Sequence, residues 1–136
     1  MSAIQEFKNL IAGKTFVDDE VMRKAEDIGR ELMGVTTTKM RQYFDDIKGL
    51  RRKIESDLSP QQIKVQLRLI LSRVAYDTGR VKGKKDKTDY NNFCLLESFL
   101  KACIDKVIKS ENIEKMTNEF ITFIEAMYGY FYFHAK

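Results

Sequence analysis

Basic side chains at helical spacing are the residues of this chain whose type and position most clearly suggest chemistry. Arg41, Lys48 and Arg52 are separated by seven and four residues, so in a helix they lie along one face, away from the apolar stripe. Lys64 and Arg68 are one helical turn apart in the next segment. Rows of this kind can follow a phosphate backbone, but they lack the compactness of a surface that reads bases. They predict contacts that position a nucleic acid without reading its sequence.

The distribution of charge along the chain favours the same kind of partner. Residues 36–88 carry fourteen Lys or Arg against six Asp or Glu, whereas residues 1–35 and 89–136 each carry five against seven. A surplus confined to one stretch indicates a surface that meets a polyanion, so RNA or DNA is the first partner to consider. The alternative is a solvated basic face without a partner.

Further basic residues in this stretch extend the predicted phosphate-binding set. Lys39 begins the same helical segment as Arg41, and a run of lysines follows Arg80 in a segment with almost nothing apolar to bury. For Arg73, a pair with Asp77 one turn away is an equally good interpretation. The additional candidates are Lys39, Arg73, Arg80, Lys82, Lys84, Lys85 and Lys87.

Residues suited to catalysis or metal binding do not converge in the sequence. The only histidine, His134, lies two residues from the C-terminus, so a Ser-His-Asp or Cys-His arrangement would depend on a chain end. Cys94 and Cys103 are nine residues apart and match no usual zinc spacing. Adjacent acids at positions 18–19 and 45–46 would point about 100° apart on a helix, so neither pair converges on one ion. The sequence predicts no enzyme, metal site, cofactor or small-molecule substrate.

The elements that must position these residues are helices. One proline in 136 residues, few glycines and apolar residues three to four positions apart predict an all-α fold, a single compact five- to six-helix bundle over residues 1–136. This length is enough to bury one core without disulfides or metal. Cys94 and Cys103 are predicted to be core residues in a reducing compartment. Without an apolar leader or a membrane-length apolar run, the protein is predicted to be cytoplasmic, with no membrane partner.

Capping and stop residues predict where the helices begin and end. The clearest start is Ser59, followed by Pro60 in the first turn and by Gln62, which completes a capping box. Gly34 and Gly79 are predicted stops. Residues 80–89 are then a mobile basic loop, followed by a Thr88 or Asp89 cap. The helices are expected over about residues 4–11, 19–34, 36–56, 59–78, 89–108 and 112–130.

An aromatic run near the C-terminus has two interpretations. The aromatic residues of positions 128–133 could form a stacking platform for single-stranded bases. Core packing is preferred because Phe120, Phe123 and Met127 continue the same stripe upstream. A terminal turn cannot bury residues on every side, so leftover aromatic surface would favour a protein partner.

Three segments, taken in order, form a pattern over most of the chain from residue 36 onward. A helix start with two threonines and a following arginine spans Thr37 to Arg41, and a central apolar helix closes in Leu-x-x-x-Ala-Tyr-x-x-Gly-Arg from Leu71 to Arg80. An aromatic C-terminal helix carries Phe-x-x-Phe-x-Glu-Ala over residues 120–126, followed by Tyr130. The ordered set resembles the small helical subunit of type III-A CRISPR effector complexes, the Csm complex.

This resemblance implies an all-helical bundle without catalysis that works beside other subunits of the Csm complex. Several copies would stack head to tail, with their basic faces lining the channel that holds guide RNA and target RNA, while a neighbouring subunit cleaves the target. Base pairing would then read sequence, and the protein would bind backbone and duplex shape. Arg41 and Arg80 stand out because they lie within the matching motifs.

Two functions from other classes remain open on the sequence alone. The first is a DNA-binding regulator that uses the third and fourth helices as a helix-turn-helix, although its recognition helix should be short and start with base-reading residues. The second is a scaffold that binds only proteins and uses its basic loop for solubility.

Overall fold

Apolar residues at three- and four-residue intervals place the chain in helices throughout the computed structural model, which describes residues 2–135. This range contains seven α-helices and no strand, which confirms the all-α class. The helices are α1 (Ala3–Ile11), α2 (Asp19–Met22), α3 (Ala25–Glu31), α4 (Thr37–Glu55), α5 (Pro60–Lys82), α6 (Thr88–Ile108) and α7 (Ile113–Ala135).

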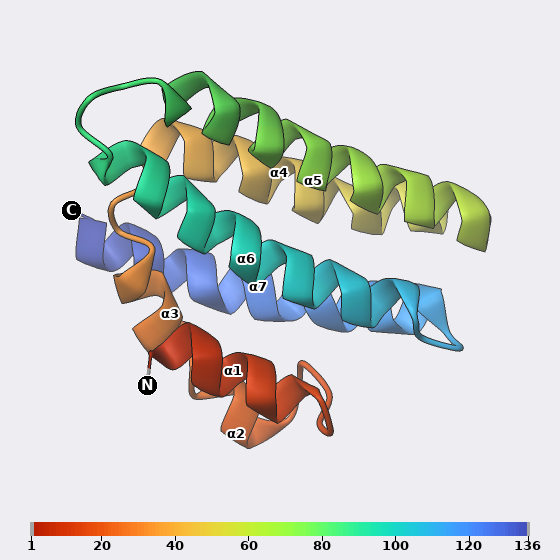
Figure 1. Ribbon diagram of the computed structural model, residues 1–136. Coiled ribbons are helices and arrows are strands. Elements are labelled where there is room, and N and C mark those ends of the chain that lie inside the picture. Colours follow the sequence, from red (N-terminus) through yellow and green to blue (C-terminus); the bar gives the residue numbers. More distant parts are fainter. Residues whose placement is uncertain (1, 136) are drawn as a thin grey trace.

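The four long helices form a bundle of two layers, with the α4–α5 pair in one layer and the α6–α7 pair in the other (Figure 1). The most extensive packing is between the layers: α4 packs mainly on α7, and α5 packs mainly on α6. The short helices α1 to α3 cover the side of the α6–α7 pair that faces away from α4 and α5, with α3 packed along α7. The outer faces of α4 and α5 therefore remain uncovered, and they carry most of the basic stretch.

Side-chain caps start two of the long helices where the sequence predicts. The Thr36 hydroxyl accepts a hydrogen bond from the Lys39 amide at 3.3 Å and begins α4. Ser59 and Gln62 form the predicted capping box at the start of α5, with Pro60 in its first turn. These contacts satisfy backbone amides that the first turn of a helix leaves without partners.

The second predicted helix is wrong as a continuous element, because the structure divides it into α2 and α3. At the junction the Lys24 amide donates to the Val21 carbonyl, three residues back, at 3.0 Å. This tighter turn interrupts the α-helical hydrogen-bond pattern. The Lys24 side chain is held by an ion pair with Glu6 of α1, so the interruption coincides with a contact between helices.

The predicted stop at Gly79 is also wrong, since α5 continues to Lys82 and ends at Gly83. The helix continues because Thr78 is buried and Val81 packs against the core. Arg80 and Lys82 therefore lie on α5, and the loop shortens to residues 83–87.

The predicted Thr88 or Asp89 cap of the next helix is wrong as well. The Asp86 carboxylate accepts from the Thr88 amide at 2.9 Å and from its hydroxyl at 2.6 Å. These two hydrogen bonds hold the pKa of Asp86 below its ordinary value. The carboxylate therefore organises the loop directly before α6.

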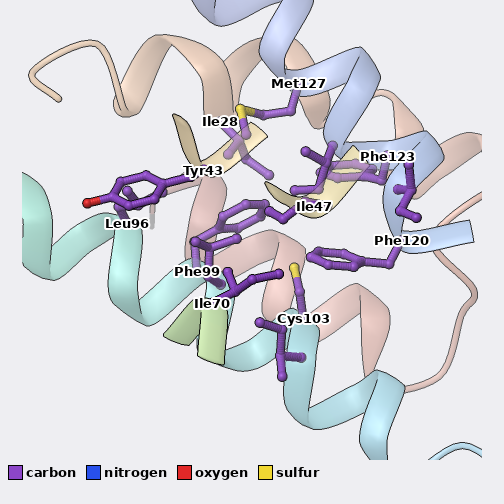
Figure 2. Packing of buried hydrophobic residues seen from close by; sticks show 14 of the residues in the cluster. Ile28, Tyr43, Ile47, Ile70, Leu96, Phe99, Cys103, Phe120, Phe123 and Met127 are labelled. Atoms are coloured by element: carbon purple, nitrogen blue, oxygen red, sulfur yellow. The ribbon is translucent and has the colours of Figure 1, made fainter. Parts of the chain in front are cut away.

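The core consists of aromatic and branched side chains that meet between α3 and the four long helices (Figure 2), and residues of α1 join the same cluster. The ring of Phe7 lies 4.8 Å from that of Phe123 and 5.3 Å from that of Phe99, centroid to centroid. Cys103 is fully buried, as predicted, and burial raises the pKa of its thiol. The prediction that Cys94 is a core residue is wrong, because this free cysteine is only half-buried.

The C-terminal aromatic run divides between core and surface, as the sequence analysis allowed. Phe131 is fully buried and Tyr128 is half-buried. Tyr130, Tyr132 and Phe133 are 43%, 46% and 72% exposed. Residues on both sides of the last turns of α7 therefore stay at the surface.

A close approach of backbones at Gly29 joins α3 to α7. A Cβ atom at this position would lie 2.8 Å from the Phe131 nitrogen and 3.0 Å from the Met127 oxygen. Both are backbone atoms, so neither can move away without shifting α7. Gly29 thus sets how closely the N-terminal helices pack on the bundle.

We expect Gly29→Ala to lower the free energy of unfolding by about 1–3 kcal/mol, the usual cost of overpacking. Gly79→Ala is the matched control, since its Cβ would meet nothing within 4 Å in the exposed interior of α5. It should raise stability by about 0.5–1 kcal/mol through helix propensity. Urea unfolding followed by circular dichroism measures both, and equal effects from the two substitutions would contradict the close approach.

Candidate nucleic-acid interface

The predicted row on α4 is present at the surface. Arg41, Lys48 and Arg52 all lie on the exposed face of the helix. Arg41 has an exposed pair with Asp45 at 3.9 Å, and the Lys48 ammonium sits 5.7 Å from the centroid of the Phe44 ring. Exposed pairs of this kind contribute little to stability, so these cations stay accessible to a ligand.

The two basic residues beside this row instead join α4 to its neighbours. The Arg51 guanidinium donates to Glu125 of α7 at 3.0 Å, and it also reaches the Thr122 hydroxyl at 3.4 Å. Lys53 donates to the Gln66 side chain of α5 at 3.0 Å. Arg51 and Lys53 therefore fix the orientation of α4 between α5 and α7.

Lys64 and Arg68 on α5 lie on a different side of the bundle from the α4 row. They line a hollow of about 450 Å³ together with Ile108 of α6. Lys48, by contrast, lies over Phe44, whose ring stacks on Tyr128 of α7. The two basic rows therefore diverge, one toward α7 and the other toward α6.

Lys39 is a half-buried predicted site residue. Its ammonium is 3.2 Å from the carboxylate of Asp77, which is only 5% exposed. The buried Tyr43 hydroxyl donates a second, short hydrogen bond to the same carboxylate. Burial is the main cause that raises the pKa of Tyr43, and the Asp77 contact adds to it. The three side chains join the start of α4 to the last turns of α5.

Arg73 lies beside this network but has a different partner from the one considered in the sequence. Its guanidinium forms a short ion pair with Asp46 of α4, so the alternative pairing with Asp77 is wrong. Asp77 instead accepts from Lys39 and Tyr43. Arg73 thus links α4 to α5 across their groove.

The remaining candidates gather at the end of the bundle where α5 gives way to α6. The Arg80 guanidinium lies 6.0 Å from the centroid of the exposed Tyr76 ring. Lys84 pairs with Asp89 at 3.2 Å, and Lys87 donates a short hydrogen bond to the Lys82 carbonyl. Lys82 and Lys85 are exposed as well. This end of the molecule therefore has a cationic surface, and several of its side chains also make local contacts.

Two adjacent acidic residues of α4, Asp45 and Asp46, are engaged with cations. Asp45 pairs with Arg41, and Asp46 pairs with Arg73. Within residues 2–135, no group of three or more His, Cys, Asp or Glu side chains could hold a metal ion. His134 instead lies 2.9 Å from Glu26, where it ties the end of α7 to α3.

The arrangement of α4 and α5 differs from a helix-turn-helix. Helix α5 has 23 residues and runs beside the 19-residue α4 along the bundle (Figure 1). A recognition helix would be short and would cross its partner at a steep angle. Helices α4 and α5 therefore do not form a helix-turn-helix.

The fold and this surface define a small all-helical protein with exposed basic residues on α4 and α5, two helices that lie on the side of the α6–α7 pair opposite α1 to α3. Among family models, the one described as Csm2 Type III-A matches residues 17–136. The chain belongs to this family, which supplies the small subunit of the type III-A CRISPR Csm complex. Helix α1 lies outside the matched range.

No curated protein and no solved structure matches the chain. None of the helices within residues 2–135 is both long and apolar enough to cross a membrane.

The Tyr43 contact predicts a pH-dependent stability. The pKa of Tyr43 is raised in the folded state, so its contribution is fully present below the unfolded value of about 10 and is lost as pH rises above it. We expect Tyr43→Phe to cost about 1–3 kcal/mol near neutral pH, through the lost hydrogen bond to a carboxylate. This difference from the parent should shrink by up to about 1.4 kcal/mol for each pH unit above 10.

Urea unfolding between about pH 8 and pH 11 measures this difference. Tyr76→Phe is the control, because Tyr76 is 67% exposed. It should change stability by less than about 0.5 kcal/mol. A gap between Tyr43→Phe and the parent that stays constant over the whole range would contradict the assigned role of the buried phenol.

Proposed function

We propose that this small subunit is non-catalytic and contacts the backbone of guide RNA and target RNA through its basic helix faces. The observation that carries the proposal is the row of Arg41, Lys48 and Arg52 on the outer face of α4. These cations point away from the core, and a row along a helix suits a phosphate backbone. Sequence would be read by base pairing between guide and target, which leaves the protein to bind charge and shape.

The contacts within the bundle divide the twelve predicted site residues into two groups. Lys39 and Arg73 are held by carboxylates of the α4–α5 groove, so we assign them to packing first and to RNA second. The group that supports RNA contact directly consists of Arg41, Lys48, Arg52, Lys64, Arg68, Arg80, Lys82, Lys84, Lys85 and Lys87.

The absence of catalysis is part of the proposal. Asp45 and Asp46 beside the basic row are each paired with an arginine, which lowers their capacity to hold a catalytic cation. We therefore assign target cleavage to another subunit of the complex. We also place the protein in the cytoplasm with the rest of the particle.

Head-to-tail association with further copies of the same chain is supported by the division of charge. Residues 1–35 have more acidic than basic side chains, and α1 to α3 lie on the side of the bundle opposite α4 and α5. The basic surplus lies in residues 36–88. Opposite charges on two sides of one subunit favour stacking of copies in one direction.

A charge-reversal variant tests the RNA proposal. For the parent, log affinity for single-stranded RNA should fall against log salt with a slope of about −2 to −4, which corresponds to three to five phosphate contacts. Reversing Arg41, Arg52 and Arg68 to Glu should remove most of this binding. Because the three side chains are exposed, each change should alter stability by less than about 0.5 kcal/mol.

The matched control reverses Lys101, Lys109 and Lys115 to Glu, which changes the net charge by the same amount through exposed residues of α6, α7 and the turn between them. This control should keep most of the binding. If the Arg41/Arg52/Arg68 variant binds RNA as well as the parent does, the protein-only scaffold becomes the better account.

A further inference from the structure

A seam of aromatic rings runs between α4 and α7, on the side where the α4 basic row lies. Phe44 and Tyr128 stack with centroids 4.3 Å apart and planes 8° apart. The Tyr132 ring follows one turn later, 6.4 Å from that of Tyr128, and 46% of this residue is exposed. The stack therefore begins in the packed interface and ends at the surface.

The register of the two helices brings this exposed ring to the basic row. Arg51 contacts Glu125, and Phe44 contacts Tyr128, so α7 runs antiparallel to α4. The next turn of α7, with Tyr132, therefore lies beside the turn of α4 that carries Arg41. In agreement, burial raises the pKa of the Tyr128 hydroxyl, the charge of Arg41 partly offsets this rise, and the carboxylate of Asp45 adds to it.

Two cations lie along the seam. Lys48 is held over the Phe44 ring at 5.7 Å. Arg41 is exposed one turn of α4 before Phe44, and it forms an ion pair with the exposed Asp45 at 3.9 Å. Seven residues of helix separate these two cations by about 10 Å along the axis. An exposed ring next to a row of cations is the combination by which proteins hold single-stranded nucleic acid: the ring stacks on a base while the cations neutralise neighbouring phosphates.

Tyr130, another exposed aromatic residue of α7, does not share this environment. Tyr130 is one turn from His134, which contacts Glu26 of α3, so this side of α7 faces the acidic N-terminal helices. The Tyr132 side of the last turns of α7 therefore lies by the basic row of α4, whereas the Tyr130 side lies by the acidic N-terminal helices.

We propose that the Tyr132 end of this seam stacks an unpaired RNA base while Arg41 and Lys48 bind the adjacent phosphates. The inference rests on the proposed RNA-contacting function and specifies the ligand of this site. The ligand is a nucleotide whose base is unstacked, and bases stacked within a duplex do not meet this requirement. The site is tolerant of sequence, because every base has a face that can stack.

The test compares two single-stranded ligands of about ten nucleotides, oligoadenylate and an abasic ribose-phosphate oligomer of equal length. The parent should bind oligoadenylate about 5- to 100-fold more tightly, the range expected for one stacked base. Tyr132→Ala should bring this ratio close to one and leave the salt slope unchanged. Tyr132→Phe should keep the ratio, since the phenyl ring still stacks.

Tyr130→Ala is the matched control, because Tyr130 is exposed to nearly the same extent as Tyr132 and lies on the other side of α7. It should keep the parental ratio. The chain has six tyrosines and no tryptophan, so tyrosine emission gives a second readout. Oligoadenylate should quench part of this emission in the parent and less of it in Tyr132→Ala.

The inference is overturned if Tyr132→Ala binds oligoadenylate as tightly as the parent, or if it weakens binding of both oligomers equally. The same holds if this variant binds RNA normally but no longer joins the other Csm subunits, since the ring would then be a protein contact. Failure of the parent to bind either oligomer at low salt would overturn the proposed function together with the inference. Salt-dependent binding of both oligomers with equal affinity would instead overturn only the inference and leave the proposed RNA-contacting function in place.

Discussion

The burial of α7 between α3 and α4 is the constraint on which the rest of the structure depends. On one side, Gly29 allows the α3 backbone to approach that of α7 around Phe131. On the other side, the Phe44–Tyr128 stack and the Arg51–Glu125 pair fix the rotation of α4. Once this rotation is fixed, the row of Arg41, Lys48 and Arg52 must point outward.

The charged residues of α4 and α5 serve two purposes that their positions in the bundle separate. Those that face the α4–α5 groove pair with one another, as Lys39 does with Asp77 and Arg73 with Asp46. Their contacts specify which helix faces meet. Those on the outer faces have at most exposed partners, so their charge is directed to solvent or to a ligand. A single basic stretch can therefore stabilise the bundle and still present a cationic surface.

Local signals predicted much of the fold. The Ser59 capping box and the Thr36 start depend on residues three apart, which the sequence displays directly. Gly79 was misjudged because the burial of Val81, which continues the helix, is a tertiary contact. The division of α2 from α3 likewise coincides with the contact between Lys24 and Glu6 of α1.

The candidate site was predictable only as a set of exposed helix positions. Helical spacing identified the α4 row, but the divergence of Lys64 and Arg68 toward α6 depends on how the helices are rotated in the bundle. The partner of Arg73 lies on another helix, at a distance in sequence where spacing gives no information. The position of Tyr132 beside the basic row has the same origin, since it follows from the register of α7 against α4.

The central claim is that the outer face of α4 lies against RNA in the assembled particle. Ultraviolet crosslinking of the purified Csm ribonucleoprotein, followed by mass spectrometry of the peptides joined to RNA, tests it most directly. The account predicts crosslinks in peptides that cover residues 41–52 of α4 and the last turns of α7. Crosslinks confined to α1–α3 or to the α6–α7 turn, in a particle that retains its RNA, would contradict it.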